Sequence, residues 1–502
     1  MTQANQPDWR RLANGLVVDG APFIDGKYHV CPDARQSTTV NPADGSDGFT
    51  YTESDERLVD TAIKAARNAW TSGWRDCGPG ERKRLLLALA DGILANSKQL
   101  ALCDCLDVGK PITAAAGESY PAAGFIRYYA EAIDKVYAGN MAPTGAGAME
   151  LQVWRARGVV AAITPWNFPL INACLKLGPA LAAGNTVVIK PSELSPRSTL
   201  LLAKIASEVG IPDGVINVLP GSGSSGQALA EHGGVDMLTF TGSTGTGKSI
   251  LQSIGGSTIK PVLLECGGKS PEIVFEDAAE LGLQDVAAQV VRGALWNQGQ
   301  VCVARSRILI QQSIYEAMLD AMATVAGGMQ PGHPLDESTL FGPLASARQQ
   351  GIVENYIQSG IDDGARLVLD GRQPAGYEQG CYVGPTVFAD VPADARIARE
   401  EIFGPVLCVM PFKDEAQALA LANDNDYGLA ATIWTQDIAR ANRMASQVKA
   451  GKVRVVASLA PVEGAGFSHS AEPCGQSGYG VEGGTNGLRS YMRQQSVELM
   501  MG

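Results

Sequence analysis

No stretch of about 18 consecutive apolar residues occurs in the 502-residue sequence, so we expect no membrane-spanning helix. Residues 1–8 are polar and lack the apolar core of a signal peptide. The sequence also lacks an excess of basic residues, and its formal net charge is −12. A nucleic acid or an anionic membrane is therefore not expected as a partner.

The ten cysteines lack the spacing of a disulfide framework or a zinc site. Cys103 and Cys105 are too close together to clamp a metal between them. Reduced thiols in a cytoplasm are the simplest interpretation, and no metal site is predicted.

Short apolar runs alternate with helical stretches after Ala156, in a chain that is too long for one hydrophobic core. This alternation indicates buried parallel strands in a doubly wound α/β domain. The predicted strands are 158–163, 186–189, 215–219 and 237–240. The predicted helices are 58–70, 81–94, 97–108, 115–136, 179–183 and 199–209.

Cys302 lies in the stretch Asn297–Ser306, between an amphipathic helical pattern that ends at Leu295 and the strand-like run Arg307–Gln311. A thiol at such a junction can face a cleft, as a nucleophile must. The alternative for any one of ten cysteines is a small buried apolar residue.

The segment Gly242–Ser249 fits the phosphate-loop pattern Gly-x4-Gly-Lys-Ser/Thr and lies between a predicted strand and a helix. Taken alone, it predicts a nucleotide triphosphatase. That interpretation needs a strand that ends in a metal-binding Asp, and the nearest candidate, Leu367–Asp370, ends in a glycine turn.

Four stretches together resemble the aldehyde dehydrogenase superfamily, and the resemblance runs from about Asn41 to about Pro411. They are 164–169 (Thr-Pro-Trp-Asn-Phe-Pro), 263–271 (Leu-Leu-Glu-Cys-Gly-Gly-Lys-Ser-Pro), 297–306 around Cys302, and 401–406 (Glu-Ile-Phe-Gly-Pro-Val). The resemblance implies a Rossmann-like cofactor domain, an α/β catalytic domain and a small β extension for oligomerisation. It also implies an oxidoreductase that converts an aldehyde or semialdehyde to the carboxylate with NAD.

The catalytic roles follow from matching residues. Cys302 is expected to form a thiohemiacetal and then a thioester, with Asn167 and the backbone N–H of Cys302 as oxyanion donors. Glu265 matches the general base that activates the hydrolytic water. Lys190 matches a family residue, and we expect it to contribute both to catalysis and to cofactor binding.

The resemblance also implies an NAD site, with NADP as an alternative cofactor. A carboxylate at Glu193 would accept hydrogen bonds from a ribose 2′-OH and repel a 2′-phosphate, which favours NAD. The alternative is that Lys190 and Glu193 are solvated turn charges. The full set of expected cofactor residues is Ile163, Thr164, Pro165, Trp166, Lys190, Ser192, Glu193, Gly223, Phe240, Gly242, Ser243, Glu265, Gly267, Glu401 and Phe403.

The expected substrate pocket contains Phe168, Leu175, Val301 and Val303. The sequence departs from the family over residues 452–478, where the usual motifs are replaced, so the resemblance does not imply which aldehyde is used. The pocket is expected to be wider than in enzymes for short aliphatic aldehydes. The helix 115–136 is either packed in the core or a wall of the substrate tunnel. Two further alternatives are a binding or structural protein that kept the fold but lost enzymatic turnover, and an enzyme that transfers the acyl group to coenzyme A. Glu265 argues against the second alternative.

The predicted cofactor domain covers 1–139 and 158–265, and the predicted catalytic domain covers 266–470. Segments 140–157 and 486–502 are expected to form strands that extend a sheet across a subunit contact. We therefore expect a homodimer or homotetramer that acts on a small-molecule aldehyde.

Overall fold

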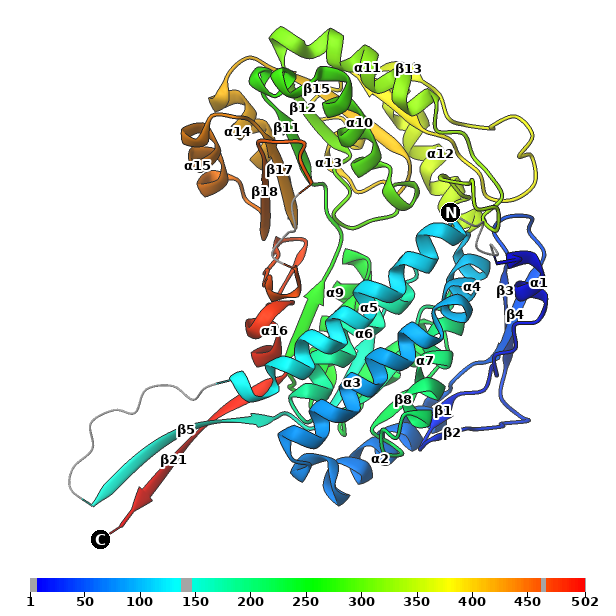
Figure 1. Ribbon diagram of the computed structural model, residues 1–502, viewed down its shortest axis with the longest axis vertical. Helices are drawn as coiled ribbons and strands as arrows, with labels where there is room; N and C mark the ends of the chain where they lie inside the picture. Colours follow the sequence, from blue (N-terminus) through cyan, green and yellow to red (C-terminus); the bar gives the residue numbers. More distant parts are fainter. Residues whose placement is uncertain (1–6, 137–146, 462–465, 502) are drawn as a thin grey trace, which may run out of the picture.

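Two open β-sheets, each packed between helices, make up most of the structure (Figure 1). It is a computed structural model that describes residues 7–136, 147–461 and 466–501. The first sheet has the strand order β2-β1-β8-β7-β6-β9-β10-β20, and the second has the order β13-β14-β15-β12-β11-β17-β18. Pairing is parallel from β8 to β10 and from β14 to β18. The predicted α/β fold with doubly wound sheets is confirmed.

The strands of the first sheet are β1 (Phe23–Ile24), β2 (Lys27–Tyr28), β6 (Val159–Ile163), β7 (Thr186–Lys190), β8 (Ile216–Val218), β9 (Met237–Thr241), β10 (Val262–Glu265) and β20 (Gly478–Tyr479). Those of the second sheet are β11 (Pro271–Val274), β12 (Arg307–Gln311), β13 (Arg366–Leu369), β14 (Thr386–Ala389), β15 (Val406–Phe412), β17 (Ala430–Trp434) and β18 (Lys452–Val456). Two-stranded sheets are formed by β3 (Gln36–Val40) with β4 (Asp47–Thr52), β16 (Tyr427–Gly428) with β19 (Cys474–Gly475), and β5 (Ala148–Ala156) with β21 (Met492–Met500).

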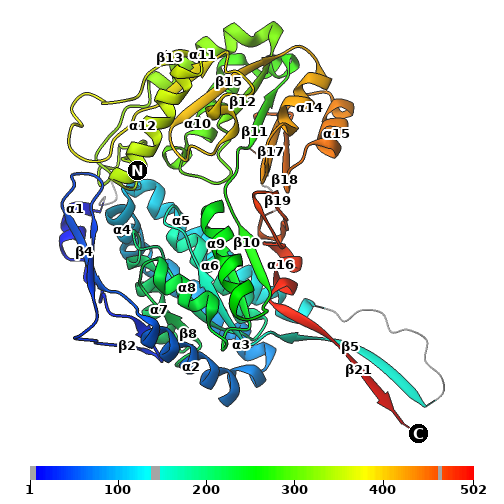
Figure 2. The same ribbon diagram turned by 180° about the vertical axis from the view of Figure 1, so that it is seen from behind.

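Alternate residues of each central strand enter different cores, as the twofold periodicity of a strand requires. In β6, Val160 and Ala162 pack with one set of helices, whereas Val159, Ala161 and Ile163 pack with the other. The first set is α3 (Pro79–Ala95), α4 (Ser97–Val108), α5 (Ile112–Ala132), α6 (Pro169–Ala182) and α7 (Arg197–Glu208). The second set, seen from behind in Figure 2, is α2 (Glu56–Ser72), α8 (Gly223–Glu231) and α9 (Thr244–Ser257).

The second sheet is covered in the same way. One face carries α10 (Leu283–Ala294) and α11 (Tyr315–Gly327). The other carries α12 (Ala347–Asp362), α13 (Arg396–Arg399), α14 (Glu415–Asn423) and α15 (Ile438–Gln447). The remaining helices are α1 (Trp9–Asn14), near the start of the chain, and α16 (Gly484–Ser490), just before β21.

The predicted helices agree with the structure except at α5 and α6. Helix α5 begins and ends earlier than the predicted range 115–136. Helix α6 begins ten residues before the predicted start at Pro179, because Pro169 at the first helical position starts it and Pro179 lies inside it. The sequence around Pro165–Pro169 has the appearance of a loop, so the start of α6 could not be recognised.

The chain crosses from the first sheet to the second between β10 and β11 and later returns. Strand β20 pairs antiparallel with β10 and places Gly478 opposite Glu265. The first sheet therefore includes residues from near the end of the chain, outside the range predicted for the cofactor domain.

The segments predicted to mediate oligomerisation pair with each other. Strands β5 and β21 are antiparallel partners along their full lengths, from Met492 opposite Ala156 to Met500 opposite Ala148. They form an arm that projects from the body, with the C-terminus near its tip (Figure 1). Residues 140–146 and 502 of the predicted segments lie outside the described residues.

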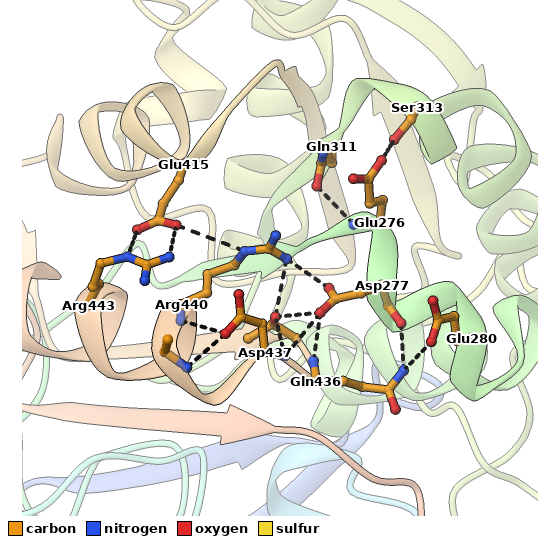
Figure 3. Close-up of polar contacts among 12 residues, drawn as sticks. Glu276, Asp277, Glu280, Gln311, Ser313, Glu415, Gln436, Asp437, Arg440 and Arg443 are labelled. Atoms are coloured by element: carbon orange, nitrogen blue, oxygen red, sulfur yellow. Dashed lines mark hydrogen bonds and ion pairs between the residues drawn. The ribbon is translucent and has the colours of Figure 1, made fainter.

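A polar network ties the loop after β11 to α14 and α15 on one side of the second sheet (Figure 3). The carboxylate of Asp277 accepts hydrogen bonds from the backbone N–H of Gln436 and, at 3.1 Å, from Arg440. Arg443 binds Glu415 through two hydrogen bonds of 2.8 Å. Exposed ion pairs of this kind contribute about 0–1 kcal/mol each, so the network fixes the positions of these elements more than it stabilises the fold.

Within the described ranges, no single helix is long and apolar enough to cross a membrane. Helices α3 and α4 would satisfy that test only as a pair, with a bend of 66° between them.

Candidate active site

A cavity of about 440 Å³ lies between the carboxyl ends of β6, β9 and β10 and the loops that lead into β12 and β15. Ligands of doubly wound sheets bind at the carboxyl ends of the strands, so this is the expected place for a cofactor. The lining residues are Pro165, Trp166, Asn167, Phe168, Ile171, Asn172, Thr241, Gly242, Ser243, Cys266, Gly267, Trp296, Val301, Cys302, Val303, Gln349, Ile352, Tyr356, Glu401, Ile402 and Phe403.

The predicted nucleophile, Cys302, lines this cavity and is half-buried. The turn before it has three consecutive residues with left-handed backbone angles: Asn297, Gln298 and Gly299, with φ of 50°, 57° and 71°. Such angles are unfavourable for the first two residues and are retained where the surrounding structure enforces them. A Cβ on Gly299 would lie 2.2 Å from the carbonyl oxygen of Gly404, so only glycine fits there.

Asn167 is held against the Cys302 loop by reciprocal hydrogen bonds. Its side-chain Nδ2 donates to the carbonyl oxygen of Gln300 at 2.9 Å, and Asn297 Nδ2 donates to the Asn167 carbonyl at 3.1 Å. Gln300 is itself fixed, because its Oε1 accepts from the backbone N–H of Ala345 at 2.9 Å. An amide nitrogen carries two hydrogens, so Asn167 retains one donor for a ligand in the cavity.

Burial raises the pKa of the Cys302 thiol to about 12, and the nearby carboxylates of Glu401 and Glu265 add to the rise. The thiolate is the nucleophilic form of cysteine. In the free protein at neutral pH, Cys302 is therefore almost entirely a neutral thiol.

Glu265 ends β10 beside the cavity, although it is not one of the lining residues. Burial raises its pKa well above the ordinary value, the carboxylate of Glu482 raises it further, and Lys176 lowers it. Lys176 is fully buried on α6, where its Nζ donates to Thr239 Oγ1 at 3.0 Å and lies 3.1 Å from Glu482. After burial, the pKa of Glu265 is therefore influenced most by two residues that the sequence interpretation did not select.

Glu401 and Phe403 approach the cavity from the second sheet. Glu401 Oε1 accepts from the backbone N–H of Gly268 at 2.9 Å, and burial raises its pKa to about 7. A Cβ at Gly267 would lie 2.2 Å from Glu401 Oε2, which explains the glycine at this position. The ring of Phe403 meets that of Trp166 edge-on, with centroids 5.3 Å apart.

Lys190, at the end of β7, is buried, and its Nζ donates to the Pro191 carbonyl at 3.0 Å and lies 3.9 Å from Glu193 Oε2. Burial lowers the pKa of Lys190, and Glu193 counteracts this effect. A Cβ at Gly226 would lie 3.6 Å from the Lys190 side chain. Buried Ser192 follows on the same turn, and its Oγ accepts from the backbone N–H of Leu194.

The sequence interpretation missed a glycine motif that follows β8. Residues 221–226 read Gly-Ser-Gly-Ser-Ser-Gly, which fits Gly-x-Gly-x-x-Gly between β8 and α8. Gly223 is the first residue of α8. Because Gly226 lies beside Lys190, the motif borders the place predicted to hold the adenosine ribose.

The features needed for a dinucleotide are present at the carboxyl edge of the first sheet. Thr164 Oγ1 and Thr241 Oγ1 are buried without a hydrogen-bond partner. A Cβ on Gly245, in the first turn of α9, would meet no atom within 4 Å, so a ligand can approach the N-terminus of that helix. Ile163 is the last residue of β6 and Phe240 the last but one of β9, and both are buried. The unpaired hydroxyls and the open helix N-terminus fit a pyrophosphate.

Residues 29–497 match the model of the aldehyde dehydrogenase family. The chain belongs to the aldehyde dehydrogenase family. It is 45% identical over 450 residues to the NADP/NAD-dependent aldehyde dehydrogenase PuuC of Escherichia coli, covering 89% of this chain and 90% of PuuC. It also resembles the solved structures of the aldehyde dehydrogenase KauB from Pseudomonas aeruginosa and of the indole-3-acetaldehyde dehydrogenase AldA from P. syringae, the latter with NAD⁺. Each is 40% identical with a TM-score of 0.94, over 98% of this chain and 99% of the other.

The protein is thus an NAD(P)-dependent aldehyde dehydrogenase, an oxidoreductase that oxidises an aldehyde. The triphosphatase interpretation of Gly242–Ser249 is wrong. Its candidate Asp370 follows β13, at the far edge of the other sheet, and its carboxylate binds Arg372 at 2.6 Å.

The aldehyde dehydrogenase has an apolar wall beside Cys302. Phe168, Val301 and Ala304 pack together, and the ring of Phe168 lies 4.9 Å from that of Trp296. Val303 is partly exposed at the same wall. Leu175, predicted for the pocket, is half-buried on α6 and does not line the cavity.

Several lining residues carry no sequence motif. Gln349, Ile352 and Tyr356 recur at helical spacing along α12, and this spacing alone gives no indication of a site. Lys176 offered a clearer signal, because a lysine on the apolar helix α6 needs a buried partner. Glu482 lies in the segment where the family resemblance becomes uneven, so it could not be chosen. Among the described residues, no cluster of three or more potential metal ligands occurs.

Proposed function

We propose that the protein oxidises an apolar or aromatic aldehyde to its carboxylate, with Cys302 as the nucleophile and Glu265 as the base for thioester hydrolysis. The observation that carries this proposal is the contact between two loops. Asn167 is bonded to the carbonyl of Gln300, two residues before Cys302, so the thiol and a free amide donor face the same cavity.

In the first half of the reaction, the Cys302 thiol loses its proton to solvent, and the thiolate sulfur adds to the aldehyde carbon to form a thiohemiacetal. The oxygen becomes an oxyanion, which Asn167 Nδ2 and the backbone N–H of Cys302 can stabilise. Because Asn167 is already fixed by Gln300, little reorganisation is needed as the charge develops.

Bound NAD would supply the acceptor for the hydride of the thiohemiacetal formed on Cys302. Lys190, Ser192 and Glu193 would hold the adenosine ribose, and the N-terminus of α9 would hold the pyrophosphate. Glu401 would bind the nicotinamide ribose, with Phe403 and Trp166 beside the ring. The exposed carboxylate of Glu193 supports a preference for NAD over NADP, because it would repel a 2′-phosphate.

In the second half, a water molecule hydrolyses the thioester on Cys302. Glu265 would accept the proton of that water, and its raised pKa makes its carboxylate a stronger base than that of an ordinary glutamate. Lys176 and Glu482 would act as positioning residues that set the charge of Glu265.

The substrate class follows from the wall beside Cys302, which presents Phe168, Trp296, Ile171, Val301 and Val303. Among the described residues that line the cavity, Glu401 carries the only charged side chain, and it is bonded to Gly268. Aldehydes with an ammonium or carboxylate tail would therefore lose solvation without gaining a partner.

We further propose a homo-oligomer in a reducing compartment such as the cytoplasm. A two-stranded ribbon is at best marginally stable alone, and the arm exposes Met149, Leu499 and Met500, which supports docking against a second copy. All ten cysteines are free thiols. The two sheets support the proposed division into cofactor and catalytic domains near residue 265.

The proposal is tested by following NADH formation with phenylacetaldehyde, an amino aldehyde and a carboxylated semialdehyde. Phenylacetaldehyde should have the highest kcat/KM, and Cys302→Ser should abolish turnover while NAD binding persists. Turnover by Cys302→Ser would refute the mechanism. NAD binding by the wild type without turnover of any aldehyde would instead support the alternative of a fold that has lost its activity.

A further inference from the structure

A buried ion pair lies behind the substrate wall, and the mechanism above does not use it. Lys110, between α4 and α5, is 1% exposed and binds the carboxylate of Glu118 on α5, which is 6% exposed. Neither residue lines the cavity. A buried charge is costly, so its presence needs an explanation.

The pair is poorly satisfied for a purely structural element. Glu118 Oε2 has no hydrogen-bond partner, and neither has Oδ1 of the neighbouring buried Asp104. Burial raises the pKa of Glu118 to about 7 and that of Asp104 to about 6, in spite of Lys110. Buried pairs of this quality can often be replaced by apolar residues without loss of stability.

The Lys110 ammonium has a second contact, which leads to the active site. Its Nζ lies 3.9 Å from the centroid of the Phe168 ring, the geometry of a cation–π interaction. Phe168 follows Asn167 directly and lines the cavity, so its ring separates the buried charge from the substrate space. On its cavity side the same residue packs with Trp296 and Val301.

We propose that Lys110 and Glu118 are positioning residues that fix the ring of Phe168 and thereby set the selectivity for bulky and aromatic aldehydes. Glu118 holds the ammonium in place, and the ammonium holds the ring face. An aromatic ring without this contact can rotate and tilt, so the wall beside Cys302 would lose its defined shape. Small aldehydes contact less of that wall and should be affected less. This inference rests on the proposed function of the cavity.

The decisive variant is the double substitution Lys110→Met/Glu118→Met, which removes both charges with little change of volume. A structural pair would allow this variant to fold with unchanged selectivity. A positioning pair predicts that kcat/KM for phenylacetaldehyde falls about 5- to 30-fold relative to acetaldehyde, the range expected for a desolvated cation–π contact. The loss should be in KM, and NAD affinity should stay within about twofold of the wild type.

Two further variants complete the test. Lys110→Arg keeps a cation over the ring and should preserve the selectivity. Lys260→Met is the matched control, because Lys260 is also buried but, within the described part of the chain, bonds only to the carbonyls of Ala230 and His232, which do not line the cavity. It should leave the ratio of kcat/KM for phenylacetaldehyde to kcat/KM for acetaldehyde unchanged. In a Phe168→Leu background, the double methionine change should have no additional effect on the ratio.

A readout without turnover separates this inference from the proposed function. Phenacyl bromide and iodoacetamide both alkylate thiols, and peptide mass analysis reports the fraction of modified Cys302. In the double variant, the reactivity of Cys302 toward phenacyl bromide should fall relative to its reactivity toward iodoacetamide, as kcat/KM for phenylacetaldehyde falls relative to acetaldehyde. If the wild type oxidises no aldehyde, the proposed function fails even if the alkylation ratio changes as expected. If both ratios are unchanged in a folded double variant, the positioning role is refuted.

Discussion

Replacing Glu265 with glutamine should separate the two halves of the reaction. The carboxylate lies at the end of β10, in a setting where burial and Glu482 raise its pKa and Lys176 lowers it. Glutamine keeps the shape of the side chain but cannot accept a proton. Thioester formation needs the Cys302 thiolate, the oxyanion donors and a hydride acceptor, whereas hydrolysis of the thioester needs a base for the water.

The size of the effect differs between the two steps. Loss of a general base typically costs about 10²–10⁴ in rate, so steady-state turnover should fall by that factor. The first step should not become slower, because the charge of Glu265 is one of the influences that raise the pKa of Cys302. Removal of that charge lowers the thiol pKa and increases the thiolate fraction.

Rapid mixing of the variant with NAD and an aldehyde measures both steps at once. NADH absorbance should rise in a burst of up to one equivalent per Cys302 and then almost stop. Acid quenching should preserve the acyl group, which intact-mass analysis would detect as an adduct. Cys302→Ser provides the control that should give neither burst nor adduct.

Wild-type steady-state rates in Glu265→Gln would refute the assigned role. A burst that is absent near neutral pH but returns at higher pH would mean that Glu265 also deprotonates Cys302. Absence of burst and adduct at every pH would place its action before hydride transfer or limit it to the fold.

The remaining predictions concern the pH profile, the oxyanion donor, the cofactor and the arm. The carboxylate fraction of Glu265 grows as pH rises through its raised pKa, and kcat should rise with it where deacylation limits the rate. Lys176→Met should shift this rise in kcat to higher pH, and Glu482→Gln should shift it to lower pH. Identical pH profiles of the variants and the wild type would contradict the influence of these two residues on Glu265. Asn167→Ala should reduce kcat about 10²–10³-fold with little change in NAD affinity, as measured by steady-state kinetics and equilibrium titration. Glu193→Gln should narrow the ratio of kcat/KM for NAD over NADP, and an unchanged ratio would show that this carboxylate is only a surface charge. Val497→Pro, which removes a backbone donor within β21, should reduce the mass measured by light scattering, and an unaltered oligomer would exclude the arm as its contact.

The elements with strong periodicity could be predicted from the sequence, because burial on one helix face or on both strand faces leaves a clear pattern. Strands β6, β7 and β9 are examples, and so is the junction that carries Cys302. The start of α6 could not be predicted, since proline is compatible with both a loop and the first turn of a helix.

The residues of the candidate site could be predicted from the sequence only where they lie in recognisable motifs. Lys176 and Glu482 meet across 306 positions of the chain, and Gln349 lies in a helix without a signature. The left-handed backbone angles of Asn297 and Gln298 could not be predicted from the sequence either, because neighbours that are distant in sequence impose them. Contacts of this kind belong to the tertiary structure and leave no local pattern.

The late return of the chain to its first sheet sets an order of events during synthesis. Until β20 emerges from the ribosome, β10 has an unpaired edge, and Glu482, the partner of Lys176, has not yet been made. A nascent chain can thus complete the second sheet while Glu265 still lacks its final electrostatic surroundings, and the open edge of the first sheet is exposed to wrong pairing. A product that terminates before residue 478 would retain Cys302 and Asn167 and yet remain an unfinished enzyme. Catalytic competence is thus expected to arise only when the last few dozen residues have been added.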